Sequence, residues 1–509
     1  MSIHPAAKVF LICICGFLLS LSAPGYDLWF LAWIGLVPLF IAISTSKKLI
    51  ESLLYSFLFG FAYNFCYLHW ILSIHPLSWL GFNNTVSLTV SFFSLLVAAF
   101  CNSVFFVLFA ILVTILKQLS VNPYNKGIPN LVLITFIWLI VFNKISCMEM
   151  FLGFPWTLVE YSQYKNLHLI QIAEYLGSIS ISFLIVFFNL VLANLVLWFF
   201  NIEKIGNRNV PKHPGQFGDI VTSFSFILIL ISLSLIFGVA SYKKNQESFS
   251  SKSRSISLVQ GNLSIKTTRG ETLDMMLANK IYGDLIKNTN ASLIIAPEAA
   301  LPTLLNYDLA TQSWIKNLSR AKNVDIISGS YCRDENMLTN CAISHSSNKL
   351  FFYEKEILVP FGEYTPYSFL LPRIIKKLAS NALSEGFKKG KKNSPLETSI
   401  GKAGVSICFE IIFPTLIRKQ SLQDAKFLVN LSDLSWFSNS RVRQQFLAFG
   451  VFRAIENRKP LVIATNNGIS AFIDPIGKIK NQSLPNTQGV LIDWINPSDK
   501  ITFYAKYGW

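Results

Sequence analysis

Long apolar runs fill the first half of the chain and predict membrane-spanning helices. A run of about 20 residues can cross a bilayer about 30 Å thick. The first run begins after Lys8 and ends at LSA, so it also fits a signal peptide, although Pro24 directly after Ala23 disfavours cleavage. We expect a membrane domain of about seven helices over residues 1–241, with spans near 9–25, 27–45, 50–73, 86–116, 131–148, 178–200 and 219–241.

From residue 254 the pattern changes to short β-branched runs that alternate with helical patterns. Helices are predicted near residues 271–289, 309–322 and 440–457. The predicted strands are SISLVQ, SLIIAPE, VDIISGS, NCAISHS, KLFFYEK, KFLVNLS, PLVIATN, GISAFID and QGVLIDW. Such alternation is typical of a layered α/β domain with a buried sheet, so we expect a second domain over residues 242–509.

The distribution of charge supports this boundary and gives an orientation. Residues 1–241 hold 10 of the 44 Lys and Arg and 7 of the 28 Asp and Glu, so residues 242–509 hold 34 and 21, a formal charge of +13. In the first half the basic residues gather in alternate loops, at Lys47, Lys48, Lys117, Lys126, Lys204, Arg208 and Lys212. The positive-inside rule makes these loops cytoplasmic, so an odd number of spans puts the second domain outside. Its basic charge therefore does not indicate a nucleic-acid partner.

Cysteine and histidine usage limits the chemistry. No C-x-x-C pair or histidine at ligand spacing accompanies the eight cysteines, which argues against a metal site. In an oxidising compartment Cys332 and Cys341 can either form a disulfide or remain two free thiols. The second domain has one histidine, His345, and no glycine-framed serine, which argues against a Ser-His-Asp triad. Cys408, in GVSICFEIIFP, is either a buried core thiol or a nucleophile that needs another base.

Three stretches place ionisable residues at the end of an apolar run. They are SLIIAPEAALP with Glu298, FFYEKEILVPFGEYTP with Lys355 and Glu363, and GVSICFEIIFP with Cys408 and Glu410. Singly, Glu298 or Lys355 could simply mark a strand end that meets water. Charged residues are almost never fully buried unless they are paired, so three such ends together favour a shared polar site.

These stretches resemble the Glu-Lys-Cys signature of the nitrilase superfamily, in which PE, K-x-x-L-x-P-F-G-E and C-[FYW]-E follow in this order. With the apolar half and the motifs VQGN, GFPW, RAIE and TNNGISA, nearly the whole chain resembles the apolipoprotein N-acyltransferase family. The resemblance implies a polytopic all-α membrane domain followed by a nitrilase-like αββα sandwich. It also implies a multi-pass protein of the bacterial inner membrane whose catalytic domain faces the periplasm.

The sequence departs from the family pattern in three places. The family usually closes with a further transmembrane helix, whereas this sequence ends at YGW, so we expect no C-terminal anchor. The family stretch NISNDAWF is NLSDLSWF here, with Asp433 and Leu434 in place of Asn and Asp. The usual QH pair is Gln445 and Phe446. These differences concern anchoring and substrate contact rather than the signature residues.

The resemblance assigns a role to each signature residue. A thiol is mostly protonated at neutral pH, so Cys408, the nucleophile, needs a base. Glu298 takes that role, because a positioned carboxylate can accept a thiol proton. Lys355 stabilises the oxyanion, Glu363 holds the Lys355 ammonium, and Glu410 has a supporting role.

The resemblance also implies the substrates. A phospholipid such as phosphatidylethanolamine donates an acyl chain to Cys408 as a thioester, without a cofactor. The acceptor is the α-amino group of the S-diacylglyceryl cysteine of an apolipoprotein, and the cycle is ping-pong. Trp436 and Phe437 are candidate lid or substrate contacts, and the basic segment 365–392 fits either a lid on anionic headgroups or a solvated loop. We expect a monomer.

Two other functions fit parts of the sequence. A membrane-tethered amidase or carbon-nitrogen hydrolase would use the same three residues and pass the acyl group to water. Seven spans exceed what a tether needs. A catalytically silent lipid-binding protein is the third reading, and the joint presence of Glu298, Lys355 and Cys408 argues against it.

Overall fold

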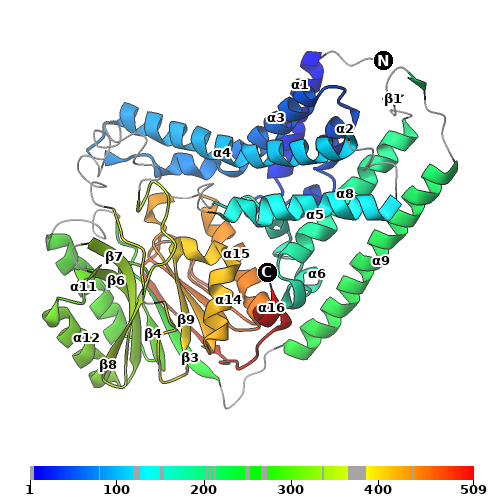
Figure 1. The fold of residues 1–509 in the computed structure, drawn as a ribbon. Helices are drawn as coiled ribbons and strands as arrows, with labels where there is room; N and C mark the ends of the chain where they lie inside the picture. The colour runs from blue at the N-terminus through cyan, green and yellow to red at the C-terminus, as the bar shows by residue number, and fades with distance from the viewer. Residues whose placement is uncertain are drawn as a thin grey trace. The chain divides into compact units, whose positions relative to one another are not determined.

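The structure is a computed structural model. It describes residues 5–78, 81–118, 127–148, 154–200, 204–205, 208–209, 214–246, 253–264, 272–334, 337–364, 386–391, 393–437 and 440–508. The chain divides into two compact units (Figure 1). One consists of Met1–His75 with Leu88–Ser241, and the other of Pro76–Ser87 with Tyr242–Trp509.

The first unit is helical and apolar, as expected for a membrane domain. Its helices are α1 (Pro5–Ser20), α2 (Val37–Thr45), α3 (Leu49–Tyr67), α4 (Asn84–Gln118), α5 (Gly127–Asn143), α6 (Leu167–Ile170), α7 (Ala173–Leu176), α8 (Ile179–Phe199) and α9 (Pro214–Asn245). In the described part of the chain, five helices are long and apolar enough to cross a membrane: α3, α4, α5 with the turn that follows it, α8 and α9. The number of crossings stays a prediction.

The second predicted span, residues 27–45, is not one continuous helix. A 3-10 turn, η1, covers Trp29–Trp33, and α2 begins only at Val37. Pro38 lies in the first turn of α2, where its missing N–H does no harm. Inside a continuous helix Pro38 could not donate to the Ile34 carbonyl and its ring would clash there, so the helix restarts.

The second unit contains a mixed sheet of seven strands. Their bounds are β3 (Arg254–Gln260), β4 (Leu293–Ile295), β5 (Leu301–Leu304), β6 (Asp325–Asp334), β7 (Met337–Ser346), β8 (Lys349–Glu354) and β14 (Gly489–Ile495). The order is β14-β3-β4-β6-β7-β8, and β5 also pairs with β6. Strands β3, β4 and β6 run parallel, whereas β6, β7 and β8 are antiparallel.

A second sheet has five strands in the order β13-β12-β11-β10-β9. Their bounds are β9 (Ala403–Ile407), β10 (Phe427–Ser432), β11 (Leu461–Thr465), β12 (Ala471–Ile473) and β13 (Ile479–Gln482). The pairs β9–β10 and β10–β11 are parallel. The apolar runs in these three strands are continuous because both faces of the sheet are buried.

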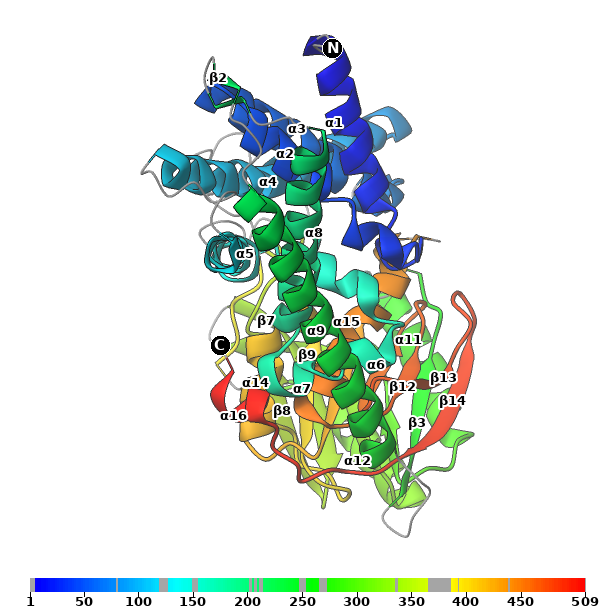
Figure 2. The same ribbon diagram turned by 90° about the vertical axis from the view of Figure 1, so that its right-hand side faces the viewer.

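The two sheets pack face to face, and helices cover both outer faces (Figure 1, Figure 2). Alternate side chains such as Leu258 and Ile295 from one sheet meet Val405 and Val429 from the other in one buried cluster. The outer layers are α11 (Thr272–Lys287) and α12 (Leu309–Lys322) on the seven-stranded sheet, and α14 (Pro414–Leu422) and α15 (Val442–Asn457) on the five-stranded sheet. This arrangement confirms the expected αββα sandwich.

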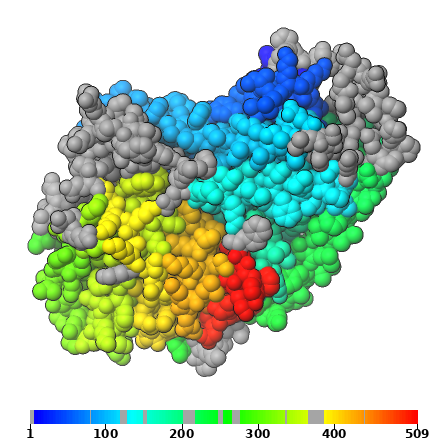
Figure 3. Space-filling view, viewed as in Figure 1, coloured from blue at the N-terminus to red at the C-terminus, as the bar shows by residue number. Residues whose placement is uncertain are grey.

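The last helix, α16 (Phe503–Tyr507), lies at the surface of the second unit (Figure 3). Its Phe503 and Tyr507 rings are exposed. Arg418, in α14, holds α16 by donating from Nε to the Ala505 carbonyl at 2.8 Å. The end of the described chain is therefore packed on the second unit.

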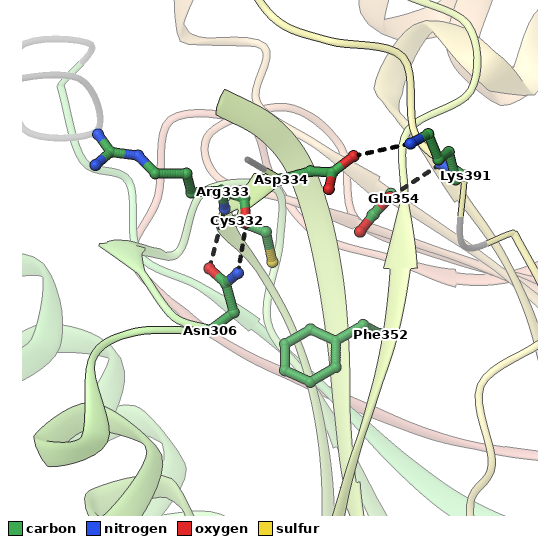
Figure 4. A pocket seen from close by; sticks show the side chains of 7 residues that line it. All are labelled: Asn306, Cys332, Arg333, Asp334, Phe352, Glu354 and Lys391. Atoms are coloured by element: carbon green, nitrogen blue, oxygen red, sulfur yellow. Dashed lines mark hydrogen bonds and ion pairs between the residues drawn. The ribbon is translucent and has the colours of Figure 1, made fainter. Parts of the chain in front are cut away.

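A disulfide joins Cys332 in β6 to Cys341 in β7, which decides between the two alternatives left open by the sequence. Both residues are buried. A cavity of about 90 Å³ lies beside Cys332 and is also lined by Asn306, Arg333, Asp334, Phe352, Glu354 and Lys391 (Figure 4).

Candidate active site

Three signature residues, Glu298, Lys355 and Cys408, each lie just beyond the end of a strand. Glu298 follows β4, which ends at Ile295, and Lys355 directly follows β8. Both strands belong to the seven-stranded sheet. Cys408 directly follows β9 of the five-stranded sheet. Residues at strand ends are suited to a site because the strands fix their backbones while their side chains remain free of the sheet.

Lys355 bridges two buried carboxylates. Its Nζ lies 2.9 Å from Glu363 Oε1 and 3.5 Å from Glu298 Oε1, and its side chain is 1% exposed. The Asn340 amide donates to the same two oxygens, at 3.0 Å from Glu363 and 2.8 Å from Glu298. The second oxygen of Glu363 accepts the Val359 N–H at 2.8 Å. The ammonium and the amide thus hold the two carboxylates side by side.

Cys408 has an unusual backbone conformation. Its φ angle is +50°, and it is the first residue of a 3-10 turn, η7 (Cys408–Ile412). A positive φ is uncommon for a residue other than glycine, and it costs of the order of 1–3 kcal/mol. The surrounding structure holds this conformation, because the Asn430 side chain donates to the Cys408 carbonyl at 3.2 Å. Such strained residues are concentrated at active sites.

Burial and neighbouring charges set the ionisation of the thiol and the ammonium. Burial raises the pKa of Cys408 well above its ordinary value, the charge of Glu298 and a hydrogen bond to it add to this, and Lys355 opposes it. Burial by itself would lower the pKa of Lys355, but Glu363 and Glu298 outweigh it and raise that pKa. Cys408 is therefore a thiol at neutral pH, and Lys355 is an ammonium.

Glu363 stays ionised although it is buried. Burial would raise the pKa of Glu363, but the Lys355 ammonium, together with hydrogen bonds from Lys355, Val359 and Asn340, lowers it below its ordinary value. The pair is thus a buried ion pair in which each partner keeps the other charged.

Glu410 connects the turn at Cys408 to the segment that carries Lys355. One carboxylate oxygen accepts the N–H groups of Glu356 and Ile357, and the other accepts the Ile407 N–H and the Tyr353 hydroxyl, all within 3.0 Å. Burial raises the pKa of Glu410 to about 7, against the effect of these donors and of Lys355. Because the strand ends at Ile407, Glu410 turns back toward β8 instead of continuing the face of β9.

Trp436 and Phe437 form the 3-10 turn η8 (Ser435–Phe437), which follows β10, and both are partly exposed. The same segment contacts Glu298, because the Asp433 N–H donates to Glu298 Oε2 at 2.9 Å. Most of the basic segment 365–392, for which a lid and a solvated loop were both open, lies outside the described residues.

Two residues that contact Glu298, Asn340 and Asp433, were not predicted as site residues, and Asp433 was noted only as a departure from the family pattern. Asn340 lies in β7, and the register of the β7–β8 hairpin, Cys341 opposite Glu354, brings it beside Lys355. The strands NCAISHS and KLFFYEK are predicted next to each other in the sequence, so pairing them was the available signal. The contact of Asp433 with Glu298 joins two sheets, and nothing local in the sequence indicates it.

The arrangement combines a thiol, a carboxylate and an ammonium, which suits nucleophilic attack on an ester or amide carbonyl. Among the residues that the structure describes, no group of three or more His, Cys, Asp or Glu is placed to hold a metal ion.

Comparison with protein families gives a match for each unit. The model described as apolipoprotein N-acyltransferase N-terminal domain matches residues 15–191, and the carbon-nitrogen hydrolase model matches residues 255–502. Among solved structures, a carbon-nitrogen hydrolase from Helicobacter pylori aligns with 48% of this chain and 89% of its own, at 16% identity and a TM-score of 0.38.

Relatives named apolipoprotein N-acyltransferase align with most of the chain. The relative from Geobacter metallireducens is 29% identical over 97% of this chain and 90% of its own length. That from Nitrosomonas europaea is 30% identical over 70% of this chain and 68% of its own length. The matches to both halves and to these relatives agree, and the chain belongs to the apolipoprotein N-acyltransferase family.

Proposed function

We propose that this chain moves an acyl group from a phospholipid such as phosphatidylethanolamine to the N-terminal S-diacylglyceryl cysteine of an apolipoprotein, through a thioester on Cys408. The observation that carries the proposal is the buried group in which Lys355 joins Glu298 to Glu363, with Cys408 near enough that the Glu298 carboxylate raises its pKa. The names of relatives that align with most of this chain supply the class of the acceptor.

In the first half-reaction Glu298 takes the proton from Cys408 as the sulfur attacks the ester carbonyl carbon. The carbonyl electrons move to oxygen, and the Lys355 ammonium stabilises the oxyanion. When the carbon–oxygen ester bond breaks, Glu298 returns the proton to the leaving oxygen. Lysophospholipid departs and the acyl group remains on sulfur.

In the second half-reaction the α-amino nitrogen of the acceptor attacks the thioester carbonyl. Glu298 accepts a proton from that nitrogen, the carbon–sulfur bond breaks, and the proton passes to the sulfur. The amide leaves and the Cys408 thiol is restored. The cycle is ping-pong because Cys408 holds the acyl group between the two substrates. It needs no cofactor because Glu298 serves as the base in both halves.

The remaining residues support this cycle. Glu363 keeps Lys355 charged and in place, and Glu410 fixes the turn that carries Cys408. Trp436 and Phe437 guide acyl chains as part of a lid. Residues 1–241 anchor the chain in the bacterial inner membrane, and residues 242–509 act on its periplasmic side as a monomer.

The test uses the purified full chain, phosphatidylethanolamine with a labelled acyl chain, and a diacylated lipopeptide. The proposal predicts label in the lipopeptide as an amide, and none with the Cys408→Ala variant. Label recovered only as free fatty acid, with the lipopeptide present, would contradict it and favour a hydrolase of the amidase type.

A further inference from the structure

Asp433 lies where Glu298 meets the five-stranded sheet. It directly follows β10, and its N–H donates to Glu298 Oε2 at 2.9 Å. The other oxygen of Glu298 is held by Asn340 at 2.8 Å and by Lys355 at 3.5 Å. Residues in or next to the seven-stranded sheet therefore hold one oxygen of the Glu298 carboxylate. A residue that follows a strand of the five-stranded sheet holds the other.

The Asp433 side chain fixes the peptide that makes this contact. Its Oδ1 accepts the Ser435 N–H at 3.0 Å and the Asn466 amide at 3.1 Å. Asp433 is 6% exposed and Glu298 8%. A buried carboxylate is retained only where donors compensate its lost hydration, and here the donors belong to two separate loops.

Asn466 extends the connection back to the seven-stranded half of the unit. It follows β11, and its Oδ1 accepts the Leu263 N–H at 2.9 Å and the Tyr282 hydroxyl at 3.1 Å. Its Nδ2 also donates to the Leu263 carbonyl at 2.8 Å. Asp433 thus links the Glu298 carboxylate to a buried network that ties the loops after β3, β10 and β11 together.

We propose that Asp433 is a positioning residue for Glu298. Its side chain holds the 433 peptide, the peptide N–H holds Glu298 Oε2, and the carboxylate is thereby aimed at the Cys408 thiol. This inference rests on the proposed function, since Glu298 acts there as the base. A base must lie within hydrogen-bond reach of its proton, and a displacement of about 1 Å can cost about 100-fold in rate.

The variants separate positioning from stability. Asp433→Ala removes the acceptor, whereas Asp433→Asn keeps an oxygen for Ser435 and Asn466. The matched control is Asp325→Ala: Asp325 is also buried and accepts from Ser346 and Ser399. It pairs with Leu293 at the start of β4, the end of that strand away from Glu298.

Two rates are measured on the full chain, well below the unfolding temperature: alkylation of Cys408 by iodoacetamide, read by peptide mass spectrometry, and acylation of Cys408 by phosphatidylethanolamine. We expect Asp433→Ala to slow both by about 10- to 100-fold, and Asp433→Asn and Asp325→Ala to stay within about threefold of wild type.

Alkylation of Asp433→Ala at the wild-type rate would overturn the inference. So would an equal loss in Asp433→Asn or in Asp325→Ala. Wild-type protein that is alkylated at Cys408 but takes no acyl group would instead overturn the proposed function, and the alkylation rates would still decide the role of Asp433.

Discussion

The buried ion pair gives the sharpest prediction on stability. Lys355→Met removes the cation that lies 2.9 Å from Glu363 and 3.5 Å from Glu298, at a site where the lysine side chain is 1% exposed. Two carboxylates then stay buried around the Asn340 amide. Removing one partner of a buried pair costs about 3–5 kcal/mol, because the other charge is left uncompensated. At about 2–4 °C per kcal/mol for a unit of this size, the unfolding temperature falls by about 6–20 °C.

The assay is thermal unfolding of the purified full chain in detergent. Lys419→Met is the matched control, because Lys419 pairs with Glu356 at 3.1 Å on the surface and such pairs contribute at most about 1 kcal/mol. The double variant Lys355→Met with Glu363→Gln removes one of the two uncompensated charges and recovers part of the loss. An unchanged unfolding temperature in Lys355→Met, or a double variant less stable than the single one, would refute the reasoning.

Three further predictions concern the same unit. Without reductant, iodoacetamide should leave Cys332 and Cys341 unmodified, and alkylation of both would contradict the disulfide. Replacing both cysteines should lower the free energy of unfolding by about 2–3 kcal/mol, because the disulfide closes a short loop in the unfolded chain. The pKa of Glu363 is lowered in the folded state, so its ionised form stabilises the fold fully above the ordinary carboxyl range near pH 4, and this stabilisation is lost as the pH falls through the lower native pKa. The unfolding temperature of Glu363→Gln should therefore fall less in acid than that of wild type. Parallel curves of unfolding temperature against pH would count against this. In the wild type four donors bind the two carboxylate oxygens of Glu410, whereas Glu410→Gln leaves one acceptor oxygen for them. Acylation of Cys408 should therefore slow by about 10-fold or more. A wild-type rate would argue against the supporting role of Glu410.

Much of the second unit could be predicted because its patterns are local. The helix expected over 309–322 is α12, Leu309–Lys322, and the helix expected over 440–457 is α15, Val442–Asn457. Glu298, Lys355 and Cys408 each end an apolar run, so their places at strand ends could be predicted from the same pattern.

The rest depends on contacts between distant segments. Asn340 reaches both carboxylates only through the register of β7 and β8, and Asp433 reaches Glu298 only because two sheets pack together. The positive φ of Cys408 is likewise imposed by its surroundings, since the end of an apolar run indicates where a strand stops but not the backbone angles of the turn that follows. In the apolar half, the length of an apolar run can be read from the sequence, but an interruption of the helix within that run cannot. The break before α2 was therefore not predicted.

The proposed cycle depends on an acyl group carried by Cys408. Intact-mass spectrometry of the full chain after incubation with phosphatidylethanolamine, without acceptor, measures this group. We expect one added acyl group that maps to Cys408, is released by hydroxylamine, and is absent from Cys408→Ala and, as a thioester, from Cys408→Ser. An unmodified wild-type chain, or an adduct of the same mass on Cys408→Ala, would contradict it.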